Sequence, residues 1–134
     1  MSWLILVTVL FLHVMADFRW QGIMAEMKSQ DWWKKQKGYY DKYKNDYIPP
    51  LFWHSFHWAC CILLPYLAIS QLMHYALGTV MPSFLVALAA NTLVHMFIDH
   101  QKANCKSINL VQDQLLHVLQ MLLTHVCLID ILAI

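Results

Sequence analysis

The sequence has few charged residues, few glycines and no paired cysteine motif. Only 13% of its 134 residues are charged and 60% are hydrophobic, whereas a soluble domain averages about 25% charged residues. The three glycines form no GxGxxG or Walker pattern, which gives no support to nucleotide binding. The four cysteines include no CxxC pair, so neither a disulfide framework nor a zinc ribbon is indicated. A chain this apolar is predicted to reside in a lipid bilayer.

The N-terminal segment also lacks positive charge. No lysine or arginine precedes Arg19, so the basic region that begins a secretory signal peptide is missing. We therefore interpret the first apolar stretch as a retained membrane helix.

Four apolar stretches predict an all-α fold, a four-transmembrane-helix bundle that forms one integral membrane domain over residues 1–134. The expected spans are about 3–20, 51–77, 83–100 and 108–134. A span needs about 17–25 residues, so the first and third must borrow flanking residues. Pro65 is expected to kink the second span. Residues 78–82 are expected to form a tight turn, and the aromatic loop 28–50 to lie on the membrane surface, partly as helix.

The positive charges predict the topology. All nine lysines and arginines lie in one of three places: directly after the first apolar stretch, in the loop 28–50, or between the third and fourth spans. With four spans, these places share one side of the membrane. The positive-inside rule then puts both termini outside and the basic loops in the cytoplasm. The predicted location is the inner membrane, with the lipid bilayer as partner, and a net charge of +1 gives no support to a nucleic-acid partner.

Each predicted span carries one pair of ionisable residues three or four positions apart, a spacing that places both on one helical face. The pairs are His13 and Asp17, His54 and His57, His95 and Asp99, and Asp113 and His117. Given the predicted topology, all four pairs fall near the cytoplasmic end. Ionisable residues within spans are costly and indicate function. Five imidazoles and three carboxylates are thus expected to converge.

Such a set of side chains is typical of a metal site in a helical bundle. Imidazole and carboxylate suit one or two divalent transition metal ions, Zn, Mn or Fe(II). The predicted ligands are His13, Asp17, His57, His95, Asp99, Asp113 and His117. His54 is predicted to be either a ligand or a general base. His74, His100, His125 and Asp130 are excluded, because they lie at other depths or on other faces.

A bound ion would lower the pKa of its water and allow attack near neutral pH. The catalytic residues are then predicted to be His54, Asp99 and Lys102. Arg19, Lys28 and Lys102 lie at the same level and are predicted to hold an anionic group such as phosphate. Gln21, Asn109 and Gln114 are predicted to orient the ligands.

The combined pattern resembles the family called domain of unknown function 3307, which comprises small membrane proteins of bacteria and their phages. The motifs that carry the resemblance are His13-x3-Asp17-Phe18-x2-Gln21, the histidines that open the second span, His95-x3-Asp99-x2-Lys102 and Asn109-x3-Asp113-Gln114-x2-His117. The resemblance covers nearly the whole chain except the loop 28–50. It implies the fold and the site but no reaction.

Three functions stay open at this point. The first is a metal-dependent hydrolase that acts on an anionic lipid headgroup or a phosphorylated substrate at the inner leaflet. The second is a non-enzymatic effector, in which the loop 28–50 binds the leaflet or a membrane protein and the His/Asp pairs only lock the helices. The third is a small proton-coupled transporter subunit, although the outward half offers few polar residues beyond Asn91, Gln120 and His125.

Overall fold

A computed structural model describes residues 2–36 and 40–132, and this part of the chain is all-α, as predicted, with no strand. The long helices are α1 (Ser2–Val14), α5 (Ile48–Leu72), α6 (Leu77–His100) and α7 (Leu110–Leu132). Two π-helical turns, η1 (Met15–Arg19) and η2 (Gln101–Cys105), extend α1 and α6. Three short helices, α2 (Met24–Met27), α3 (Gln30–Lys34) and α4 (Tyr40–Tyr43), lie between η1 and α5.

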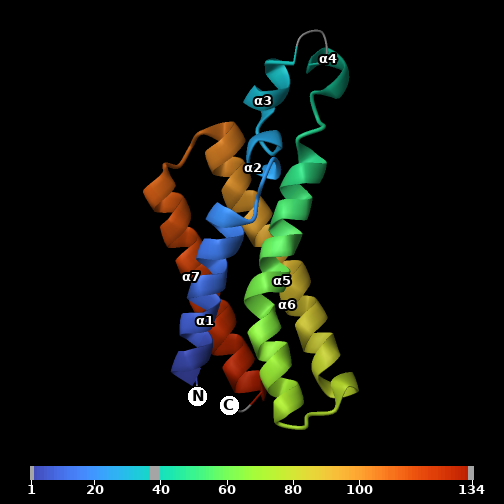
Figure 1. Cartoon of the computed structure of the whole chain (residues 1–134), viewed down its shortest axis with the longest axis vertical. Coiled ribbons are helices and arrows are strands. Elements are labelled where there is room, and N and C mark those ends of the chain that lie inside the picture. The colour runs from blue at the N-terminus through green and yellow to red at the C-terminus, as the bar shows by residue number, and fades with distance from the viewer. Residues whose placement is uncertain (1, 37–39, 133–134) are drawn as a thin grey trace.

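The long helices pack as a closed ring in which α1 contacts α5, α5 contacts α6, α6 contacts α7, and α7 contacts α1 (Figure 1). Both chain ends and the α5–α6 turn lie at one end of the bundle. The short helices and the α6–α7 connection lie at the other end, so all the described basic residues gather there. We call this the basic end. The basic loops therefore lie together at one end of the bundle.

The helix bounds differ from the prediction at the α5–α6 turn. Residues 78–82 were expected to form this turn, but α6 begins at Leu77 and includes Pro82. The chain reverses instead at residues 73–76, where His74 adopts a left-handed conformation with φ of 61°. Pro82 is the sixth residue of α6 and has no N–H to donate to residue 78, yet the helix continues through it, as α5 does through Pro65. The prediction of a turn at 78–82 was therefore wrong.

The segment between the first two long helices is partly helical, as α2, α3 and α4 show. Residues 37–39 of the predicted loop 28–50, and residues 133–134 of the predicted fourth span, lie outside the described residues. The second long helix keeps Pro65 in its interior. At 25 residues it is about 37 Å long, at roughly 1.5 Å per residue, enough to cross a bilayer core of about 30 Å.

The bundle carries apolar side chains on its outside. Trp3 on α1, Leu72 on α5 and Val86 on α6 are 79%, 77% and 71% exposed, and α7 exposes a row of leucines and valines. Large exposed apolar surfaces mark an interaction with membrane or protein. Apolar side chains also form a buried core between the long helices, in which Ile62 and Met121 are fully buried.

By length and composition, two helical segments within the described residues qualify as membrane spans, not the four predicted. They are Ile48–Leu72 and the continuous segment Leu77–Cys105. The helix α1 has only 13 residues before its π-helical turn. The helix α7 is diluted by polar residues, among them Gln120 and Asp130. The four-span topology therefore stays a prediction.

Candidate metal centre

Six ionisable side chains from four segments converge inside the basic end of the bundle. The segment η1 supplies Asp17, α5 supplies His54, α6 supplies His95 and Asp99, and α7 supplies Asp113 and His117. All six are buried, and none is more than 5% exposed. The helices α1 and α6 continue at this end of the bundle as the π-helical turns η1 and η2, and such turns are frequent at functional sites.

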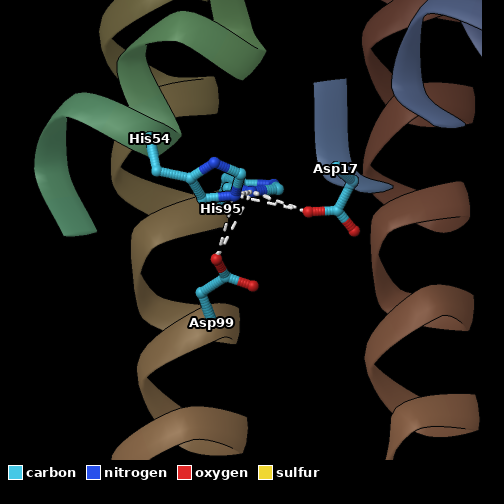
Figure 2. A group of neighbouring side chains, drawn as sticks. All are labelled: Asp17, His54, His95 and Asp99. Carbon is cyan, nitrogen blue, oxygen red and sulfur yellow. Dashed lines mark hydrogen bonds and ion pairs between the residues drawn. The ribbon is translucent and has the colours of Figure 1, made fainter. Parts of the chain in front are cut away.

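The first group that could hold a metal ion is Asp17, His54, His95 and Asp99, shown in Figure 2. The Nε2 atom of His54 lies 3.1 Å from Nε2 of His95, 3.3 Å from Oδ1 of Asp17 and 3.2 Å from Oδ2 of Asp99. The His95 Nε2 atom lies 3.7 Å from the same Asp99 oxygen. A four-coordinate ion with bonds of about 2.0–2.1 Å holds its ligand atoms roughly 3.3 Å apart. The group therefore has the spacing of a coordination shell.

The second group is Asp17, Asp113 and His117. The Nε2 atom of His117 lies 3.5 Å from Oδ1 of Asp113 and 3.5 Å from Oδ1 of Asp99. Asp17 belongs to both groups, and Asp99 faces histidines of both. The two groups thus form one continuous cluster, which we call the His/Asp cluster.

Two lysines partly neutralise the cluster. The Lys28 ammonium lies 2.6 Å from Oδ2 of Asp99, and the Lys102 ammonium lies 2.7 Å from Oδ2 of Asp113. Three buried carboxylates, those of Asp17, Asp99 and Asp113, therefore face two ammonium groups. These groups leave one negative charge in excess, and an uncompensated buried charge is costly. A proton on an imidazole such as His117, or a bound metal ion, would balance this charge.

A chain of hydrogen bonds that begins at Trp58 holds the carboxylates of Asp17 and Asp113 in place. The indole N–H of Trp58 donates to Nδ1 of His13 over 2.9 Å, so the ring proton of His13 lies on Nε2 and donates to Oε1 of Gln114 over 3.1 Å. The Gln114 amide nitrogen then donates to Oδ2 of Asp17 and Oδ2 of Asp113, each over 2.9 Å. His13 was predicted to be a metal ligand, but both of its ring nitrogens form hydrogen bonds with Trp58 and Gln114, which belong to neither group. Gln114 lies where the sequence predicted a ligand-orienting residue.

The segment that follows η1 covers the cluster. The backbone carbonyl of Lys28 accepts a hydrogen bond from the Asn104 amide over 3.1 Å, and the backbone N–H of Gln30 donates to the Asn104 amide oxygen over 2.7 Å. Lys106 also pairs with Asp31 on this surface. The hydrogen bond from Lys106, with one from Lys34, lowers the pKa of the exposed Asp31 carboxyl. These contacts hold Lys28 over Asp99.

A cavity of about 480 Å³ opens beside the cluster at the basic end. Its lining includes Asp17, Arg19, Gln21, Lys28 and Lys102. Gln21 donates to Oδ1 of Asp17 over 3.3 Å, and the Arg19 side chain is exposed. The three cations predicted to bind an anion therefore line one cavity, although Lys28 and Lys102 are paired with cluster carboxylates.

Two other predicted site residues lie outside the cluster. His57 is half-buried, with its Nε2 atom 3.6 Å from the Cys61 sulfur and its ring edge-on to Trp20. Asn109 forms a capping box at the start of α7. The Asn109 side chain accepts a hydrogen bond from the backbone N–H of Gln112, and the Gln112 side chain accepts one from the backbone N–H of Asn109, each over 2.9 Å. Asn109 thus caps a helix rather than orienting a ligand.

Sequence reasoning missed two residues that support the site. Trp58 lies one helical turn beyond His54, a spacing that was visible in the sequence, and its ring stacks on that of His95 at a centroid distance of 4.1 Å. Asn104 gave no signal, because its partners Lys28 and Gln30 are more than 70 positions away in the chain. Among the excluded histidines, His125 instead bonds to Tyr66 over 2.7 Å, and His100 stacks on Tyr47.

Comparison of the chain with protein-family models, with curated proteins and with solved structures finds no match. The resemblance to domain of unknown function 3307 therefore stays a prediction, and the chemistry of the His/Asp cluster has to carry any functional conclusion.

Proposed function

We propose that this chain is a four-span membrane protein that binds a divalent transition metal ion in its His/Asp cluster and uses it for hydrolysis. The observation that carries the proposal is the first group, in which two imidazole nitrogens and two carboxylate oxygens from three segments lie within 4.8 Å of one another. The predicted substrate is an anionic headgroup or a phosphorylated molecule at the inner leaflet.

The distribution of polarity supports a membrane location. Apolar residues such as Phe11, Leu93 and Leu123 are 61%, 63% and 60% exposed, while the ionisable residues of the cluster are buried. This arrangement suits a lipid environment, in which ionisable residues face the interior of a bundle. The basic end then faces the cytoplasm by the positive-inside rule.

The arrangement supports hydrolysis in three ways. The 480 Å³ cavity, which Asp17 also lines, would give water and substrate access to an ion held by Asp17, His54, His95 and Asp99, provided that one of these four groups leaves its position to a water molecule. Zinc with three protein ligands and one water molecule would lower the pKa of that water to about 7. Arg19 and the two lysines line the cavity and would hold an anionic group.

Metal analysis tests the first part of the proposal. The protein, purified in detergent without added metal or chelator, is expected to contain transition metal by elemental mass spectrometry. After chelator treatment, adding zinc or manganese in about 100-fold excess over the dissociation constant should stabilise the fold by about 2.7 kcal/mol, seen as a higher Tm. A preparation with neither bound metal nor a metal-dependent rise in Tm contradicts the proposal.

One observation favours the non-enzymatic alternative. Lys28 and Lys102 already pair with Asp99 and Asp113 at 2.6 and 2.7 Å, so the cluster could act only as an ionic lock between helices. In that function, the surface formed by α2 to α4 would bind the leaflet or a membrane protein.

Lys28→Met separates the two functions. Without metal, the variant leaves the buried Asp99 carboxylate without its ammonium partner, so we expect a loss of about 3–5 kcal/mol of stability, measured by chemical unfolding. If the cluster binds metal, adding zinc should restore this loss, and zinc affinity should rise at least about tenfold because a competing cation is gone. Lys35→Met, at an exposed position of the same segment, is the matched control. Destabilisation that zinc does not repair supports the ionic lock.

A further inference from the structure

We propose that the His/Asp cluster holds two metal ions, the second bound by the group of Asp17, Asp113 and His117 together with Asp99. This inference rests on the proposed metal-binding function and adds a site to it. The first ion would occupy the group of Asp17, His54, His95 and Asp99, and the carboxylates of Asp99 and Asp17 would bridge the pair.

His117 is the strongest evidence for the second site. Its side chain is 0% exposed, and neither of its ring nitrogens has a hydrogen-bond partner among the described residues. Buried polar atoms are normally paired, so each exception requires an explanation. The Nε2 atom lies 3.5 Å from one oxygen of Asp113 and 3.5 Å from one oxygen of Asp99. These spacings are close to the roughly 3.3 Å between ligand atoms of a four-coordinate ion.

The oxygen atoms of the carboxylates divide between the two sites. Asp113 directs Oδ2 to Lys102 and Gln114, whereas its buried Oδ1 has no hydrogen-bond partner and faces His117. Asp99 places Oδ2 3.2 Å from His54 and Oδ1 3.5 Å from His117. One carboxylate therefore presents its two oxygens to histidines of different groups, as a bridging ligand does.

Two divalent ions would bring four positive charges to three carboxylates that already pair with Lys28 and Lys102, so a second ion requires these lysines to move away and an anion to bind. Lys102 is the counter-ion of Asp113, and its side chain is 34% exposed and lines the cavity. It can therefore turn toward solvent or toward an anionic ligand when a metal ion neutralises Asp113. An anion in the cavity would offset the remaining positive charge.

Two ions would define the chemistry more narrowly than one. Paired ions about 3.5–4 Å apart clamp the attacking and leaving oxygens of an in-line displacement, as in many phosphatases and nucleases. A second ion therefore points to a phosphate ester as the substrate class, with the cations of the cavity on the non-reacting oxygens.

Manganese stoichiometry and magnetic resonance test the inference. Apo protein in detergent is titrated with Mn²⁺, and bound metal is counted by elemental analysis after desalting. We expect two ions per chain and an exchange-coupled manganese pair in the electron paramagnetic resonance spectrum. His117→Ala should retain one ion with the six-line signal of isolated manganese, and the matched control His74→Ala, at an exposed position outside the cluster, should retain two coupled ions.

The outcomes distinguish the two proposals. One uncoupled ion in the wild-type protein overturns the second site and leaves the metal-binding function intact. No bound ion in the wild-type protein overturns the metal-binding function itself. If His117→Ala fails to fold, the coupling in the wild-type spectrum still decides, because isolated and paired manganese give different signals.

Discussion

Asp99→Asn is expected to lower the affinity for divalent metal by at least about 100-fold. Loss of a residue that only hydrogen-bonds to a metal ligand typically lowers affinity by about 10- to 100-fold. The Asp99 carboxylate lies within 3.2–3.7 Å of His54, His95 and His117, so it is the one acid that contacts three histidines of the cluster. Asparagine keeps the size of the side chain but removes the negative charge that a cation requires. The measurement is isothermal titration of apo protein with zinc.

A second variant separates metal binding from folding. In Asp99→Asn, the ammonium of Lys28 loses its partner while it is 8% exposed, which should cost about 3–5 kcal/mol of stability. The double variant Asp99→Asn with Lys28→Met should recover that stability but not the metal affinity. The exposed Asp130→Asn serves as the matched control for the charge change. Wild-type zinc affinity in the stable double variant would show that Asp99 is not a ligand.

Trp58→Ala is expected to reduce stability by about 3–5 kcal/mol, the range for a buried aromatic residue. The Trp58 side chain is 0% exposed and lies in the apolar core, where its ring stacks on His95. Its removal leaves a cavity between the core and the cluster. Chemical unfolding in detergent measures the loss, and Trp53→Ala, on the same helix but 58% exposed, is the control.

Trp58→Phe tests the hydrogen bond alone. Phenylalanine keeps an aromatic ring but removes the N–H that holds Nδ1 of His13 at 2.9 Å. We expect His13 to lose its fixed tautomer and Gln114 its orientation, so that metal affinity falls about tenfold, with a stability loss of about 1–3 kcal/mol. Unchanged metal affinity would show that the chain from Trp58 to Gln114 does not position the carboxylates.

The sequence predicted the helical architecture because long apolar stretches indicate helices and the polar segments between them indicate the connections. Three of the four long helices extend over most of the stretches expected for them, and α1 does so with its π-helical turn. The turn at 78–82 was wrong, because glycine and proline mark turns only on average and here Pro82 lies inside a helix. The reversal uses His74 instead, a residue with no turn signal.

Spacing also predicted which side chains meet, since residues three or four apart share a helical face. Asp17, His95, Asp99, Asp113 and His117 do converge. Spacing could not show which of the two histidines of α5 faces the cluster, because either side of the helix could have turned toward the centre of the bundle. Packing against α6 turns His54 to the cluster and leaves His57 beside Cys61.

The sequence by itself determined that the chain is helical and apolar, with its acids and imidazoles paired along helices and its positive charges at one end. These are consequences of local periodicity and composition, which each segment carries independently of the others. Only the tertiary structure decided which atoms face one another: that Lys28 covers Asp99, that Trp58 fixes His13, and that Asp99 faces both groups. Such contacts join positions tens of residues apart, and the packing of four helices sets them, through angles and rotations that no single segment encodes.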